Sequence, residues 1–206
     1  MLPLLLLACS TTSKGTGDYS VDAWADNWFA LYVEEDLVAE DSVPITTERS
    51  FNSESFSFDA TAPFQVAVKL MDYKENDSGL EYIGESNQQM GDGGFILQMY
   101  DSSGALVAVT NSDWRCYVIH TAPLDPSCED DADPTSTCTA EILDEPDGWT
   151  AADFDDSSWA AATEHSAADV SPKEGYDDIT WDSSAAFIWG SSLTQDNTVL
   201  CRVTVE

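Results

Sequence analysis

Basic residues are scarce in this chain. Of its 206 residues, seven are lysine or arginine and two are histidine, whereas 39 are aspartate or glutamate. The formal net charge is -32 at pH 7, and the acidic residues are spread along the whole sequence. A surface of this sign repels phosphate groups, so nucleic acid and anionic membrane surfaces are not expected as partners. It also repels itself, so we expect salt or bound divalent cations to stabilise the folded domain.

Motifs of known catalytic chemistry are also absent. The chain has no G-x-S-x-G nucleophile motif, no H-E-x-x-H zinc motif and no C-x-x-C pair. Its histidines, His120 and His165, could act as bases near neutral pH, but a surface or packing role is commoner for each. Carboxylates are so abundant that composition leaves a glycosidase pair open, yet nothing in the sequence singles out two of them at a defined spacing. The sequence therefore predicts a protein without catalytic activity.

Long amphipathic helices and fixed-period repeats are missing as well. Apolar residues instead alternate in short runs bounded by Gly, Asp, Asn, Ser and Pro, a pattern typical of β-strands. The clearest run contains Phe64, Val66, Val68 and Leu70 on one face. Residues 18–206 are thus expected to form one all-β domain. The expected strands cover 28–33, 37–38, 56–58, 64–70, 95–99, 105–110, 114–119, 187–189 and 198–205.

The first nine residues form a leucine-rich run that ends in Ala8 and Cys9. This run is shorter than the roughly 20 apolar residues that span a bilayer, so it indicates an export signal. The segment Leu6-Leu7-Ala8-Cys9 resembles the lipobox of bacterial lipoproteins. That resemblance implies a signal peptide over 1–8 and a lipidated Cys9, with a flexible tether completing 9–17 and the lipid as the sole membrane contact. A plain secretory signal, with Cys9 lost or unmodified, is the alternative.

The remaining four cysteines favour two disulfides in an oxidising compartment. Three connectivities are possible. Cys116 and Cys201 both lie in predicted strands at positions that face the core, so we expect them to pair. Cys128 and Cys138 would then close the acidic, proline-rich loop over 122–148. This pairing predicts a secreted protein.

A resemblance to a known family rests on several short segments. Residues 148–159, GWTAADFDDSSW, resemble the W-x(n)-F-D-D-S-x-W signature of galactose-binding-like jelly-roll domains, which accompany many glycoside hydrolases. Further similar segments are 25–33, 112–116, 188–189 and 196–199, together with Arg202. The resemblance implies a single jelly-roll β-sandwich with a long disulfide-stapled acidic loop. Its relatives bind sugars, calcium or protein, so the fold alone does not assign a function.

Two aspartates of that signature have alternative roles. Asp155 and Asp156 could be ligands of a metal or a sugar hydroxyl. The favoured alternative is that their carboxylates cap backbone N–H groups of a tight turn, while Phe154 and Trp159 fill the core.

Ligand recognition is expected in the loops at the ends of the sheets, because strands use alternate residues for the core. Loops with both aromatic and hydrogen-bonding groups are predicted at 22–28, 72–82 and 176–181. Aromatic faces stack on sugar rings and acidic groups accept bonds from hydroxyls. The candidates are Trp24, Tyr73 and Trp181 as stacking faces, and Asp26, Asn27 and Asp178 as polar contacts to a neutral sugar.

Calcium is the cofactor that the acidic loops favour, because this cation prefers several converging oxygens. The predicted ligands are Asp125, Glu129, Asp130, Asp131 and Asp133, with Asp72, Glu75 and Asp77 as a second group. A solvated acidic loop that binds no metal is the commoner explanation for such clusters.

Three functions follow, in order of preference. The first is a non-catalytic carbohydrate-binding module, secreted or anchored at the cell surface. The second is an adhesion or structural module that binds a surface protein and that calcium stabilises. The third is an enzyme acting on polysaccharide.

Overall fold

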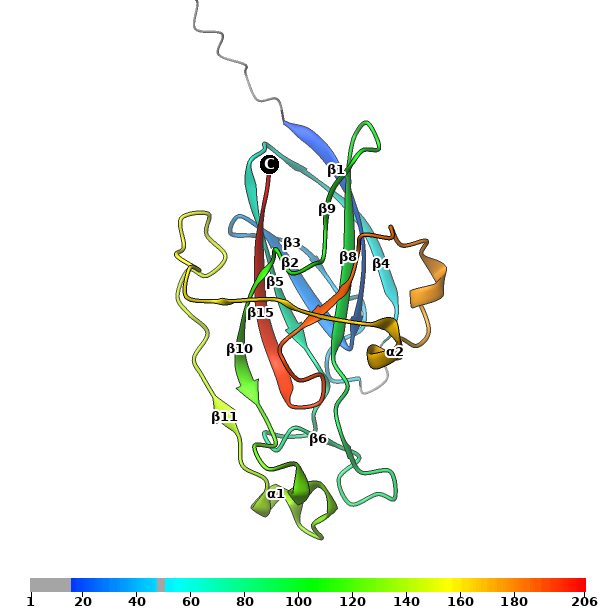
Figure 1. Cartoon of the computed structure of the whole chain (residues 1–206), viewed down its shortest axis with the longest axis vertical. Helices are drawn as coiled ribbons and strands as arrows, with labels where there is room; N and C mark the ends of the chain where they lie inside the picture. Colours follow the sequence, from blue (N-terminus) through cyan, green and yellow to red (C-terminus); the bar gives the residue numbers. More distant parts are fainter. Residues whose placement is uncertain (1–15, 48–50) are drawn as a thin grey trace, which may run out of the picture.

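Two antiparallel β-sheets face each other in the structure of this protein, a computed structural model that describes residues 16–47 and 51–206. Figure 1 shows their strands running along the long axis of the molecule. The predicted signal peptide over 1–8, the lipidation site Cys9 and most of the predicted tether lie outside the described residues.

The first sheet has the strand order β13-β14-β8-β1-β4, and β9 also pairs with β8. The pairing of β1 with β8 runs from Tyr19 opposite Asp101 to Asp26 opposite Gly94. Its strands are β1 (Gly17–Asp26), β4 (Ser53–Ala60), β8 (Gly94–Asp101), β9 (Leu106–Val109), β13 (Thr163–His165) and β14 (Phe187–Trp189).

The second sheet has the order β11-β10-β15-β5-β2-β3, and β12 also pairs with β10. Its strands are β2 (Trp28–Val33), β3 (Asp36–Glu40), β5 (Phe64–Met71), β10 (Arg115–Thr121), β11 (Glu141–Ile142), β12 (Ala160–Ala161) and β15 (Asp196–Val205). A separate ribbon pairs β6 (Leu80–Glu81) with β7 (Gln89–Met90).

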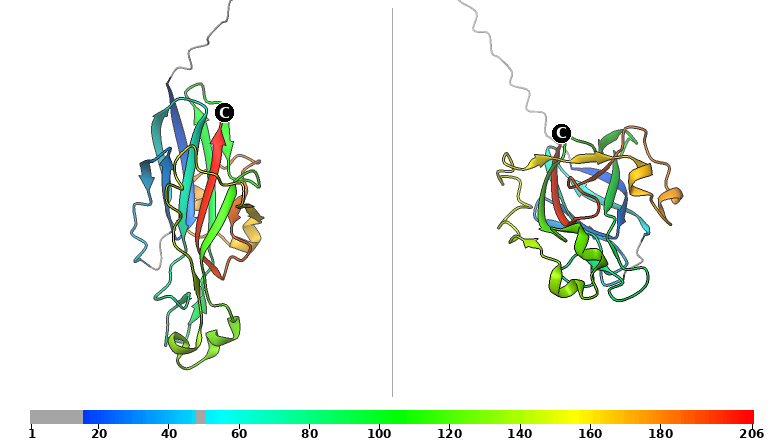
Figure 2. Two further views of the ribbon diagram at one scale, coloured as in Figure 1. Left: turned by 90° about the vertical axis from the view of Figure 1, so that its left-hand side faces the viewer. Right: turned by 60° about the horizontal axis from the view of Figure 1, so that its bottom comes forward.

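Short helical turns lie in the connections. They are η1 (Pro126–Asp130), α1 (Pro134–Thr137), α2 (Ala167–Val170) and η2 (Tyr176–Asp178). Figure 2 shows η1 and α1 beside the β6 region at one end of the elongated sandwich, opposite the C-terminus. The segment with α2 and η2 covers the outer face of the first sheet, where Val170 and Tyr176 pack against Trp24 and Phe187.

The core lies between the sheets and uses alternate strand residues. Phe64, Val66, Val68 and Leu70 of β5 are all buried in it, as their spacing predicts. Phe29 of β2 meets Phe95 of β8 across the interface, with ring centroids 5.7 Å apart. Burying one such side chain stabilises the fold by about 1.5 to 3 kcal/mol. The all-β sandwich is confirmed, and its jelly-roll classification stays a prediction.

Both predicted disulfides are confirmed. Cys116 on β10 lies directly opposite Cys201 on β15, and both are buried in the core. Cys128 and Cys138 join η1 to the end of α1 and staple the acidic loop. Two disulfides are typical of an oxidising environment, which indicates an extracellular location. Among the described residues, no helix is both long and apolar enough to span a membrane.

The F-D-D-S-x-W segment forms a capped turn on the outer face of the second sheet. Asp155 Oδ1 accepts the backbone N–H two residues further on, at 3.1 Å. Asp156 instead pairs with the buried guanidinium of Arg202, with Oδ2 3.2 Å from Nη1. Phe154 and Trp159 pack with their rings 5.5 Å apart in a separate aromatic cluster. The favoured structural role is confirmed for Asp155 and Trp159, whereas Asp156 holds an ion pair and caps no turn.

Candidate functional site: an acidic cluster beside a polar hollow

Three aspartates from separate segments meet at the end of the sandwich that carries β6 and β7. Asp26 is the last residue of β1, Asp72 follows β5, and Asp92 precedes β8. Sheet pairing brings them together: Asp26 lies opposite Gly94, and Met71 lies opposite Trp28 at the start of β2. One carboxylate oxygen of each aspartate lies within 4.8 Å of the other two. We call Asp26, Asp72 and Asp92 the aspartate cluster.

The aspartate cluster is largely sealed from water. Asp26 and Asp72 are 0% and 1% exposed, whereas the side chain of Asp92 is 39% exposed. Glu81 of β6 is a further buried carboxylate, and its charge acts on Asp26 and Asp72. Gly91 permits the close approach, because a Cβ there would lie 1.6 Å from Oδ2 of Asp72.

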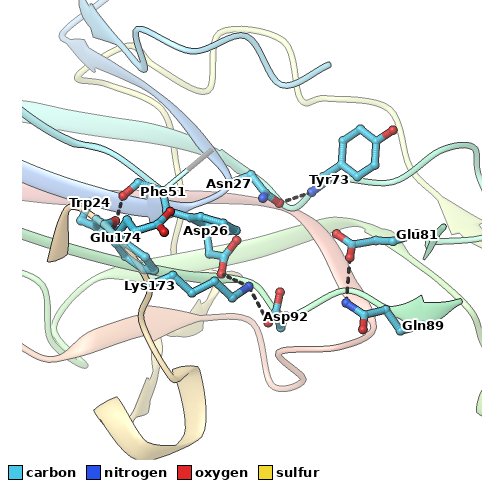
Figure 3. A network of polar contacts seen from close by, with 10 residues as sticks. All are labelled: Trp24, Asp26, Asn27, Phe51, Tyr73, Glu81, Gln89, Asp92, Lys173 and Glu174. Atoms are coloured by element: carbon cyan, nitrogen blue, oxygen red, sulfur yellow. Dashed lines mark hydrogen bonds and ion pairs between the residues drawn. The ribbon is translucent and has the colours of Figure 1, made fainter. Parts of the chain in front are cut away.

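Within the described part of the chain, one ammonium group reaches the cluster. Lys173 Nζ lies 3.2 Å from Oδ2 of Asp26 and 2.9 Å from Oδ2 of Asp92 (Figure 3). The same ammonium lies 4.4 Å from the ring centroid of Phe51. These contacts leave the Lys173 side chain 36% exposed at the edge of the cluster.

Burial governs the protonation of these groups. Loss of water raises the pKa of Asp26 to about 8; the Asp92 charge adds to this and Lys173 opposes it. Burial also raises the pKa of Asp72 well above its usual value, and the Asp26 and Glu81 charges add to this. Burial alone would lower the pKa of Lys173, but Asp26 and Asp92 outweigh it and raise that pKa. In this environment the protonated forms of Asp26 and Asp72 and the charged form of Lys173 are favoured.

A polar hollow of about 310 Å³ opens beside the cluster. Within it Glu81 Oε2 accepts from Gln89 Nε2 at 2.9 Å, a contact drawn in Figure 3. Hydrogen-bonding groups dominate its wall, together with one half-buried tyrosine ring. We call this the amide hollow; it is lined by Asn27, Phe51, Glu81, Tyr82, Asn87, Gln89, Asp92 and Lys173.

A second hollow of about 340 Å³ lies on the other side of Phe51, which borders both. Its wall combines backbone and small polar groups. The residues are Val43, Phe51, Asn52, Ser53, Glu174, Gly175 and Asp178.

The prediction that Trp24 offers a stacking face to a sugar is wrong. Trp24 lies inside β1 and is fully buried. Its Nε1 donates to the carbonyl oxygens of Phe51 at 2.9 Å and Glu174 at 3.1 Å. Trp24 therefore holds together the two segments that border both hollows.

Asp26 and Asn27 are also not surface contacts. The predicted loop over 22–28 is strand up to Asp26, and both side chains are buried. Asn27 Oδ1 accepts the backbone N–H of Tyr73 at 2.5 Å and lines the amide hollow. The prediction is wrong here because Asp26 and Asn27 take part in buried polar contacts at the end of β1 and do not face solvent.

The other three sugar candidates are dispersed. Tyr73 is half-buried beside Asn27. Trp181 is half-buried, stacks on Tyr176 with ring centroids 5.7 Å apart, and donates Nε1 to the carbonyl of the same residue. Asp178 is exposed and lines the second hollow. The six candidates therefore do not form one surface.

The calcium site predicted at Asp125, Glu129, Asp130, Asp131 and Asp133 is not formed. Asp125 Oδ1 accepts from the backbone N–H two residues further on, and Asp133 Oδ2 accepts from Ser136. Glu129 Oε1 instead accepts the N–H of Met90 at 3.3 Å. Short-range bonds of this kind turn neighbouring carboxylates away from a common centre. Within the described ranges, the acidic groups that converge are those of the aspartate cluster.

The second predicted calcium group is divided by the fold. Asp72 belongs to the aspartate cluster, but Glu75 Oε1 accepts the N–H of Ile83 and Asp77 pairs with Lys74 at 2.9 Å. Sequence reasoning missed Asp92, Glu81 and Lys173 altogether. The run Gly91-Asp92-Gly93-Gly94 was the available signal, because closely spaced glycines indicate that backbone approaches other groups.

Each histidine ring forms a hydrogen bond to a backbone carbonyl group. His120 is buried, its Nε2 donates to the carbonyl of Asp77, and burial followed by the Lys74 charge lowers its pKa. His165 Nε2 donates to the carbonyl of Gly190.

Comparison of the chain with protein-family models, curated proteins and solved structures finds no match.

Proposed function

We propose that this protein is an extracellular, non-catalytic module that binds a neutral carbohydrate in the amide hollow. The observation that carries the proposal is the composition of that wall. Asn87 and Gln89 are exposed amides that both donate and accept hydrogen bonds, and Tyr82 adds a ring at the same opening. A concave site with convergent polar groups and one aromatic face suits a sugar ring.

The negative charge around the amide hollow determines which class of sugar can bind there. Glu81 and Asp92 line the hollow, and the chain has a net charge of -32. Uronic and sulfated glycans would meet repulsion there, so the ligand is a neutral glycan. Affinity for a single site would be weak, because a small open hollow buries little area and a flexible glycan loses entropy when it is ordered.

Burial argues against a hydrolytic role for the aspartate cluster. A glycosidase needs two carboxyl groups that touch the scissile bond. Asp26 and Asp72 have essentially no exposed surface, so neither can contact a substrate.

Attachment to a membrane through a lipid on Cys9 remains part of the proposal.

A protein-binding role is the second candidate, and the stapled loop favours it. Leu124, Ile142 and Leu143 are exposed apolar side chains in or beside this loop. The backbone N–H of Leu143 donates to Ile119 of β10, and that of Leu124 donates to Thr139 within the loop. Exposed apolar residues that lie close together are typical of interaction surfaces.

Glycan-array binding followed by calorimetry with a bound neutral oligosaccharide tests the proposal. Tyr82→Ala and Asn87→Ala should each weaken binding by at least about tenfold, or ~1.4 kcal/mol. Tyr100→Ala is the matched control, because Tyr100 is a half-buried tyrosine that lines neither hollow. Unchanged affinity in both hollow variants would contradict the proposal. Absence of any glycan ligand, with a protein captured through Leu124 and Ile142, would favour the second candidate.

A further inference from the structure

The aspartate cluster carries more negative charge than its surroundings compensate. Among residues 16–47 and 51–206, the charges of Asp26 and Asp92 act on Asp72, and Lys173 is the cation in contact with Asp26 and Asp92. With these three aspartates and Lys173 ionised, two negative charges would remain unbalanced. Ionised groups that are buried without compensation are strongly destabilising. An additional positive charge would therefore stabilise this end of the sandwich.

Two buried oxygens of the cluster have no partner. Asp26 Oδ1 and Asp72 Oδ1 are inaccessible to water and accept no hydrogen bond. Lys173 reaches only Oδ2 of Asp26 and does not bond Asp72. Buried carboxylate oxygens are nearly always satisfied by a donor or an ion. These oxygens indicate that a ligand of positive charge completes the cluster.

The spacing of the oxygens suits calcium. Calcium binds oxygen ligands at about 2.3 to 2.6 Å, so two ligands on opposite sides of the ion stand about 4.6 to 5.2 Å apart. The three aspartates each offer an oxygen within 4.8 Å of the others. Magnesium, with ligands at about 2.0 to 2.1 Å and a preference for retained water, suits a dry cluster of this width less well.

We propose that one calcium ion binds among Asp26, Asp72 and Asp92 and displaces the ammonium of Lys173 from the two aspartates that it contacts. Lys173 now bonds Oδ2 of Asp26 and Oδ2 of Asp92, two of the three ligands, so the ammonium and the metal compete. The displaced side chain can move outward, because it is already 36% exposed beside Phe51. The site does not depend on carbohydrate binding.

Calcium titration of the purified, oxidised, chelator-stripped protein tests the proposal. Isothermal calorimetry with calcium chloride alone should show one site per chain. Asp72→Asn and Asp92→Asn should each weaken it by at least about tenfold. Asp131→Asn, which removes one charge from the exposed stapled loop, is the matched control and should leave the affinity unchanged. Lys173→Gln should bind calcium more tightly than the parent, because the competing ammonium is gone.

Several results would overturn the proposal. The parent protein could show no calcium heat, or Asp131→Asn could lose as much affinity as Asp72→Asn. Weaker binding by Lys173→Gln would contradict the displacement. Circular dichroism checks that each variant is folded. If Asp72→Asn is unfolded, Asp92→Asn decides the question, because the side chain of Asp92 is itself 39% exposed.

Discussion

Asp26 should make the stability of this protein fall as pH rises when no metal is present. The pKa of its carboxyl is about 8 in the folded chain, against 3.8 for an ordinary aspartate, because burial disfavours the charged form. The folded state therefore holds a proton that the unfolded state has released between these two values. Stability is fully present below about pH 4, is lost through neutral pH, and levels off above about pH 8.

The size of this effect follows from the same two values. Each pH unit within the window costs up to about 1.4 kcal/mol, so the whole window costs on the order of 5 kcal/mol. Asp72, whose pKa is also raised by burial, acts in the same direction. Glu81, Asp92 and Lys173 are the other charged groups that face Asp26. Exposed carboxylates with lowered pKa values, such as Asp101, act in the opposite direction but below about pH 4.

Urea denaturation followed by tryptophan fluorescence measures how the free energy of unfolding changes with pH. The titration runs from about pH 5 to about pH 8.5, with chelator present and ionic strength constant. Asp26→Asn mimics the protonated carboxyl, so the stability of this variant should fall less steeply with pH than that of the parent, with the remaining slope due to Asp72, and should exceed the parent's at the alkaline end. Asp131→Asn should keep the slope of the parent. A parent stability that is constant or rises with pH, or an unchanged slope in Asp26→Asn, would refute the reasoning.

Three further predictions concern stability. Replacing Cys128 and Cys138 by serine should lower the free energy of unfolding by about 2.5 to 3 kcal/mol in urea, because the bridge closes a loop of 10 residues; no loss would contradict a structural role. Arg202→Met should cost about 3 kcal/mol, because the guanidinium is buried, pairs with Asp156 and donates to two backbone carbonyls; an unchanged denaturation midpoint would count against this ion pair. Trp24→Phe removes an indole N–H shared by two backbone carbonyls and should cost about 1 to 3 kcal/mol; equal melting temperatures in calorimetry would show that those bonds contribute little.

The strands that could be predicted from the sequence are those in which large apolar residues occupy every second position. Val66, Val68 and Leu70 mark β5, and the core-facing positions of Cys116 and Cys201 identify their disulfide. Strand β1 was missed because two of its four core positions, 23 and 25, are alanines. The tryptophan between them, at position 24, instead faces the outer side of the sheet under the segment that carries α2.

The aspartate cluster could not be predicted from the sequence, for a physical reason. Asp26, Asp72 and Asp92 become neighbours only through the register of β1 with β8 and of β2 with β5. In a chain with 39 acidic residues, carboxylates adjacent in sequence suggest a site more readily than distant ones do. The stapled loop shows the weakness of that signal, because there Asp125 and Asp133 bond their own turns.

Nuclear magnetic resonance titration with the best neutral oligosaccharide from the array tests the location of the ligand most directly. Weak binding in fast exchange still shifts the amide signals of the residues that line the site. We predict the largest shifts at Tyr82, Asn87 and Gln89 around the amide hollow. Shifts confined to Trp149 and Thr150, which line a separate hollow on the second sheet, would contradict the assignment.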